Sequence, residues 1–180
     1  MDSAIRVIDA INFRIGRTIM WLAVLLGLVQ FTVVIMRYVF AIGSIPLQES
    51  IWYMSGILFM TGAGFTLLAD GHVRVDVFYR EASARKKAWV DLLGGLFFMM
   101  PVCIATFMLS RTYVLNSWRV LEGSTETSGI QGIFLLKTFL WVFAILVGLQ
   151  GIALILRAIR YLRGDSEDYS PAGVKGVAGE

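Results

Sequence analysis

Few side chains in this 180-residue sequence could carry out chemistry. The chain has one histidine, His72, and one cysteine, Cys103. Two residues are too few for bis-histidine haem ligation or for a zinc or copper cluster within the chain. A single cysteine also excludes an intrachain disulfide, and Cys103 is expected to be a small buried apolar residue. The serines have no paired base, and no glycine-rich phosphate loop is present. The sequence therefore predicts no enzyme and no cofactor.

The remaining polar candidates lie inside or beside long apolar runs. Gln30 and Gln150 are the strongest polar groups inside such runs, but their expected depths differ by roughly 9 Å, which is too far for a direct hydrogen bond. We expect each glutamine to bond to a neighbouring helix. Arg37 ends one run and Glu49 begins the next, and the sequence leaves open an ion pair between them or two solvated charges. His72 is expected to cap a helix end or to bond a backbone carbonyl.

The elements that must position these groups are four uncharged runs. The chain is 57% hydrophobic and 16% charged, with a mean hydropathy of +0.73, whereas soluble domains average about 45–50% apolar and about 25% charged residues. The runs are 19 or 20 residues long, and a helix needs roughly 20 apolar residues to cross a bilayer core. We therefore predict an all-α integral membrane protein. Its four transmembrane helices are expected at about 18–37, 49–70, 91–111 and 137–157.

Basic residues divide unevenly between the two sides of these predicted helices. Twelve Lys and Arg residues lie in the N-terminal stretch, the second loop and the C-terminal tail, and four lie in the first and third loops. Because cytoplasmic loops are rich in Lys and Arg, both termini are expected in the cytoplasm. The net charge of +3 is then explained by membrane topology, and no nucleic-acid partner is predicted.

The segments outside the four runs indicate short interfacial helices and a flexible end. Residues 1–17 place four isoleucines at near-helical spacing, which predicts an amphipathic cytoplasmic helix before the chain turns into the bilayer. These isoleucines are Ile5, Ile8, Ile11 and Ile15. The second loop mixes apolar residues with five cations and predicts another interfacial helix, near anionic membrane lipids. The membrane domain, residues 18–163, is followed by a tail, residues 164–180, that we expect to be disordered.

Motifs at the ends of the predicted helices match a known family. Arg37-Tyr-Val-Phe40 closes the first run, Pro46-Leu-Gln-Glu-Ser50 opens the second, and Gly71-His-Val-Arg-Val-Asp76 follows it. With Leu149-Gln-Gly-Ile152 in the last run, their order resembles the small membrane subunit of tripartite ATP-independent periplasmic (TRAP) transporters, the DctQ-like family. The resemblance covers roughly residues 16–163, and the His-Val-Arg-Val-Asp run is its most specific part.

The resemblance implies a bacterial transport system of three components in the inner membrane. A periplasmic solute-binding protein captures a small carboxylate, and a large membrane subunit holds the substrate and the coupling ion, sodium. The present chain is then the small permease subunit of this symport system, which braces the static scaffold of the large subunit. The residues of structural importance that the resemblance carries over are Arg37, Glu49, His72 and Asp76. It implies no catalytic role for any of them.

The third loop is the longest connection, and its segment 122–129 is the main polar surface on the outer side. Glu122 and Glu126 in this segment are candidates for docking the binding protein, and a solvated turn is the alternative explanation. For the chain as a whole, the main alternative is an autonomous four-helix transporter that acts as an oligomer. Such a protein is expected to carry an acidic residue inside a span, whereas Glu49 lies at the outer edge of one.

Overall fold

The computed structural model covers the chain and describes residues 1–72, 79, 81–166 and 168–173. Within these residues all regular secondary structure is helical. Four helical segments are long and apolar enough to cross a membrane, which confirms the predicted all-α membrane fold. In chain order, the helices are α1 (Asp2–Tyr38), α2 (Ile45–Leu68), α3 (Ala84–Gly94), the π-helix η1 (Gly95–Met99), α4 (Met100–Arg119) and α5 (Ile133–Arg163).

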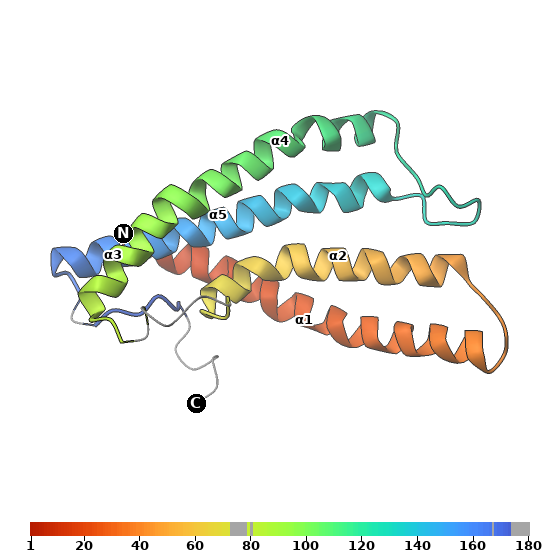
Figure 1. The fold of residues 1–180 in the computed structure, drawn as a ribbon, viewed down its shortest axis with the longest axis horizontal. Helices are drawn as coiled ribbons and strands as arrows, with labels where there is room; N and C mark the ends of the chain where they lie inside the picture. The colour runs from red at the N-terminus through yellow and green to blue at the C-terminus, as the bar shows by residue number, and fades with distance from the viewer. Residues whose placement is uncertain (73–78, 80, 167, 174–180) are drawn as a thin grey trace.

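The long helices lie side by side in a row (Figure 1). In this row α1 packs on α2, α2 packs on α5, and α5 packs on α4, while α1 and α4 make no contact with each other in the described part of the chain. The beginning of α1 and the end of α5 meet at one end of the row, where Arg160 Nη1 lies 2.5 Å from Asp2 Oδ1. We call this end the terminal end. The opposite end, with the connections 39–44 and 120–132, is called the loop end.

The first helix differs from its prediction because α1 is continuous from Asp2 to Tyr38. The expected turn between an amphipathic segment and the first span is therefore not formed. The residues buried along α1 are Ile5, Ile8, Asn12 and Gly16. Their spacing of three, four and four residues returns to one face after three turns of 3.6 residues. Ile11 lies off this face and is 39% exposed within the chain, and the amphipathic character of residues 1–17 towards the membrane stays a prediction.

The third membrane segment runs without a break from Ala84 to Arg119, so the interfacial helix predicted in the second loop leads directly into it as α3. Pro101 lies near the start of α4, and a proline inside a helix lacks the amide hydrogen and crowds the carbonyl four residues earlier. The segment relieves this conflict in η1, where the Met100 amide bonds to the Gly95 carbonyl five residues back. Such a wide turn lets a helix continue through an irregularity.

Three helices end in the same local motif, in which one residue just beyond the helix adopts a left-handed conformation. This residue is Asp70 after α2, Leu121 after α4 and Gly164 after α5, with φ values of 56°, 46° and 84°. After α2, the Gly71 amide donates to the Thr66 carbonyl at 2.8 Å, as expected of a Schellman cap. Backbone chemistry therefore fixes where these helices stop and where the following segments begin.

Candidate functional site

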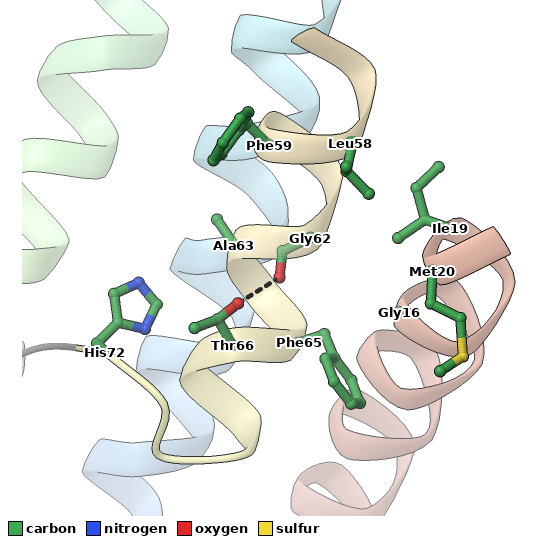
Figure 2. Close-up of a pocket in the computed structure, with 10 residues that line it drawn as sticks. All are labelled: Gly16, Ile19, Met20, Leu58, Phe59, Gly62, Ala63, Phe65, Thr66 and His72. Carbon is green, nitrogen blue, oxygen red and sulfur yellow. Dashed lines mark hydrogen bonds between the residues drawn. The ribbon is translucent and has the colours of Figure 1, made fainter. Parts of the chain in front are cut away.

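An apolar groove of about 460 Å³ opens between α1 and α2. Figure 2 shows Ile19 and Met20 of α1 across from α2, and His72, which follows the end of α2, on the same side of that helix as Ala63. The Thr66 hydroxyl donates to the Gly62 carbonyl at 3.1 Å, so this polar group is satisfied within its own helix. The lining of the groove is thus almost entirely hydrocarbon, with His72 as its one titratable residue among those described.

The glycines beside this groove have different physical explanations. A Cβ atom at Gly16 would lie 2.2 Å from the Phe65 ring, so the close crossing of α1 and α2 requires glycine there. A Cβ atom at Gly62 would meet nothing within 4 Å, although glycine inside a helix costs about 1 kcal/mol relative to alanine. Packing inside the described chain therefore does not account for Gly62. Phe59, one turn before it, is 74% exposed.

A buried polar network joins α1 and α5 close to the terminal end. Arg157 Nη2 donates to both carboxylate oxygens of Asp9, at 2.5 and 2.6 Å. Gln150 donates from Nε2 to Asp9 Oδ1 at 3.1 Å and accepts from Asn12 Nδ2 at 2.9 Å. Asn12 and Gln150 are each 1% exposed. Because buried charges and amides are stable only when they are paired, these four side chains specify how α1 meets α5.

The same network includes a close approach to α2. Asn12 Oδ1 has no hydrogen-bond partner among the described residues, and a Cβ atom at Gly64 would lie 2.2 Å from this oxygen. The Asn12 side chain therefore occupies the space that a larger residue at position 64 would need. Leu146 of α5 lies on the same spot, 3.1 Å from that Cβ position. Gly64 thus marks the place where α1, α2 and α5 come together.

Sequence reasoning found one member of this network and missed three. Gln150 bonds to a neighbouring helix in the structure, whereas Asp9, Asn12 and Arg157 were not candidates. Asn12 interrupts the buried face of α1 with an amide, and Arg157 follows Gln150 by seven residues, which is two helical turns. Polar residues at matching positions on two apolar faces were the available signal. Gln30 lies exposed on α1 and forms no side-chain hydrogen bond with the residues that the structure describes.

Glu49 anchors the third loop. It accepts a hydrogen bond from the Ser124 hydroxyl and another from the Ile130 amide, the latter at 2.5 Å. Tyr53, one turn further along α2, donates to the Ile130 carbonyl at 3.1 Å. Arg37 lies exposed at the end of α1, and within the described part of the chain the ion pair between Arg37 and Glu49 is not formed. Arg37 thus stays a prediction as a residue of structural importance, without Glu49 as its partner here.

The two acidic residues of the third loop have different surroundings. Glu122 forms an ion pair with Lys137, whose ammonium group holds the pKa of the Glu122 carboxyl below its usual value. Glu126 is exposed and lines a cavity of about 360 Å³ together with Glu49 and Trp52. Trp52 is 72% exposed. The structure thus leaves Glu126, and not Glu122, open for contact with another molecule.

His72 follows the end of α2 and is exposed. The cap of that helix is made by the backbone of Asp70 and Gly71, so the cap expected from His72 is supplied by its neighbours. His72 also lines a second cavity of about 350 Å³, which Asp91 of α3 borders as well. Asp76 lies outside the described residues.

The four membrane-length helices define a multi-pass membrane protein. The family model of "Tripartite ATP-independent periplasmic transporters, DctQ component" matches residues 18–166. The chain therefore belongs to the DctQ family, whose members are small membrane subunits of TRAP transporters, and the resemblance seen in its motifs is confirmed. This family is a transporter component and not an enzyme family, and it normally works with a large membrane subunit and a periplasmic binding protein. No curated protein and no solved structure matches the chain.

Proposed function

We propose that this chain braces the scaffold of the large TRAP subunit while that subunit moves a small carboxylate together with sodium. The observation that carries the proposal is the unfilled groove between α1 and α2, where a Cβ atom at Gly62 would meet nothing within 4 Å. Small residues let helix backbones approach closely in a membrane, where lipid supplies no hydrophobic drive for association. A transmembrane helix of the large subunit is the occupant that we propose.

The distribution of charge supports a passive role. The ionised network near the terminal end pairs Asp9 with Arg157, so these charges neutralise each other. Among the described residues, the groove lining has no carboxylate that could hold a cation. An autonomous transporter needs such a group inside the membrane, and this favours the brace over the alternative in which the chain carries solute by itself.

We further propose an orientation and an outer contact. The excess of Lys and Arg at the terminal end supports cytoplasmic termini in the inner membrane, which gives the loop end a periplasmic position. Glu126 and Trp52 then face the compartment of the binding protein, next to the loop anchor Glu49. Glu126 and Trp52 form the proposed docking surface, because Glu122 is engaged by Lys137. Arg37, His72 and Asp76 stay candidates for contacts with the large subunit.

The experiment compares Gly62→Leu with Gly27→Leu, two substitutions at helix glycines whose Cβ positions are open within the chain. Gly62 lines the groove, whereas Gly27 does not. We expect Gly62→Leu to lower co-purification with the large subunit and solute uptake about tenfold or more. The variant chain alone should melt at the wild-type temperature.

Gly27→Leu is expected to keep assembly and uptake near the wild-type level. Wild-type assembly and uptake with Gly62→Leu would contradict the groove as the docking surface. Solute uptake into liposomes that contain only this chain would contradict the brace itself.

A further inference from the structure

The segment 168–173, which we call the tail segment, crosses the terminal end of the row. It turns back after α5 and runs past α3 towards the end of α2 (Figure 1). The Tyr169 hydroxyl donates to Asp91 Oδ2 of α3 at 2.5 Å. The Pro171 carbonyl accepts from Arg157 Nη1 of α5 at 3.1 Å, and the Gly173 amide donates to the carbonyl that ends α2, at 2.8 Å. Six residues thus bind three helices.

Tyr169 is held both by a hydrogen bond and by a contact between aromatic rings. Its hydroxyl shares Asp91 Oδ2 with the hydroxyl of Tyr79, which donates at 2.6 Å. The centroid of its ring lies 5.3 Å from the centroid of the Tyr161 ring. Burial, together with the neighbouring Asp91 carboxylate, raises the pKa of the Tyr169 phenol. The phenol therefore remains a hydrogen-bond donor throughout the physiological pH range.

Gly173 lies directly on the ion pair between α1 and α5. A Cβ atom at this position would lie 2.3 Å from Leu68 Cδ1, 2.4 Å from Arg157 Nη2 and 2.9 Å from Asp9 Oδ2. The side chains of Arg157 and Asp9 are 12% and 18% exposed. A backbone that covers them limits the access of water, and the electrostatic attraction between paired charges strengthens as water is excluded.

The tail segment also joins helices that do not otherwise meet. In the described part of the chain, α3 packs on α5 and makes no contact with α2. The bonds at Tyr169 and Gly173 connect α3 to α2 through the tail. Directly after α3 comes η1, where the helix widens, and a Cβ atom at Gly94 would meet nothing within 4 Å. Helices bend readily at such irregular turns. The tail segment therefore holds α3 next to the point at which the angle between α3 and α4 can change.

We propose that the tail segment is a latch that holds α3 against the ends of α2 and α5 and covers the ion pair of Asp9 with Arg157. When the latch opens, α3 loses the hydrogen bond from Tyr169 and the end of α2 loses the one from Gly173, while the four membrane helices keep their packing. A few hydrogen bonds at the surface hold the latch, and segments held in this way open locally far more often than the whole protein unfolds. The latch is independent of the function proposed above.

The test measures chymotrypsin cleavage after residue 169 in the full chain, purified in detergent micelles. Each rate is divided by the rate for a free peptide of residues 160–180 that carries the same substitution. When opening and closing are fast, the cleavage rate follows the population of the open latch. We expect the wild-type chain to be cleaved at least tenfold more slowly than its peptide.

Two variants should open the latch. Gly173→Val places atoms where Leu68 and Arg157 lie, and Tyr169→Phe removes one hydrogen bond to a carboxylate. We expect each to raise the normalised cleavage rate about tenfold, since a hydrogen bond to a charged group stabilises by about 1.5 kcal/mol or more. Gly43→Val is the matched control, because Gly43 lies at the loop end and its Cβ position is open. It should leave the rate unchanged.

Either of two results would overturn the latch. One is cleavage of the wild-type chain as fast as the free peptide. The other is a wild-type rate in Tyr169→Phe, which removes a single hydroxyl and leaves every membrane helix as it is. If Gly173→Val fails to fold, Tyr169→Phe still decides the question.

Discussion

The two ends of the helix row are held together by different means. At the terminal end, charged and amide side chains from α1 and α5 are buried against each other, and the tail segment covers them. At the loop end, a backbone loop is bound to Glu49, and α1 lies there beside α2 (Figure 1). None of the most apolar 18-residue window of α1 is buried within the chain, against 39% of the corresponding window of α5.

This difference teaches how a small membrane subunit can be both rigid and incomplete. A polar network near one end of the row sets how the helices meet, because an unpaired polar group in a low-dielectric environment is costly. The apolar faces then need no partner inside the chain, and they stay available for lipid or another subunit. The comparison predicts that substitutions at the terminal end unfold the protein, whereas those at the loop end act locally.

The largest effect is expected from Arg157→Met, which keeps the apolar stem and leaves the largely buried Asp9 carboxylate without its cationic partner. Breaking a buried ion pair in this way costs about 3 kcal/mol, so Tm in detergent should fall by roughly 10 °C. The double variant Asp9→Asn/Arg157→Met removes both charges and should recover part of the loss. A single variant that melts at the wild-type temperature would show that the network does not hold the terminal end.

Smaller changes in the free energy of unfolding are expected from Gly64→Ala and Gly27→Ala. The first substitution should destabilise the protein and the second should stabilise it. The new Cβ atom at Gly64 would lie 2.2 Å from Asn12 Oδ1, and overpacking of this kind costs about 1–3 kcal/mol. At Gly27 the space is open, so alanine should stabilise the helix by up to about 1 kcal/mol. Thermal unfolding of both variants measures the difference. Equal shifts would mean that the crossing of the three helices is looser than the structure has it.

Next in size is Glu49→Gln, which replaces a charged acceptor by a neutral one at the loop anchor. The free energy needed to open the third loop should fall by about 1 kcal/mol. Cleavage after Glu126 by a glutamyl endopeptidase should therefore become about fivefold faster. The matched variant Arg37→Gln should leave this rate unchanged, because Arg37 is exposed and does not pair with Glu49. A similar increase in both variants would indicate that Arg37 and Glu49 form an ion pair after all. Tm should change little in either case.

The smallest effect concerns the pH dependence of the loop end. Lys137 lowers the pKa of the Glu122 carboxyl from its usual 4.5, so this pair stabilises the fold above pH 4.5. The contribution is lost as the pH falls below 4.5 through the lowered value. Titration of a carbon-13-labelled Glu122 carboxyl by NMR should give a midpoint below 4.5, and Lys137→Gln should move it upward. An unchanged midpoint in Lys137→Gln would show that the ion pair does not form in solution.

Composition was enough to predict the membrane helices, because four uncharged runs of spanning length leave few other folds. Helix order in the row could not be predicted in this way, since apolar faces of equal hydropathy do not specify their neighbours. The pairing of Asp9 with Arg157 connects residues 148 positions apart, and each alone is typical of a solvated charge near a membrane surface. Glu49 was singled out from the sequence, but its partners are backbone and hydroxyl groups of a distant loop, which hydropathy does not reveal.

The predicted domain boundaries, and with them the disorder expected beyond residue 163, stay predictions. The contacts of Tyr169 and Gly173 depend on groups contributed by three helices. A tail rich in Gly, Ser and Asp shows none of these groups in its own sequence. A polar composition therefore predicts that a segment lacks a core of its own, and it does not predict whether another part of the chain binds the segment.

The wide turn at η1 has a consequence for how the length of this chain can change. Removing one residue from a regular α-helix rotates everything that follows by about 100° and turns its lipid-facing side inward. A π-turn already holds one surplus residue, so a deletion within Gly95–Met99 returns the helix to regular winding and keeps both flanks aligned. This short stretch is therefore where the third membrane segment can lose a residue and still present α4 to α5 in register.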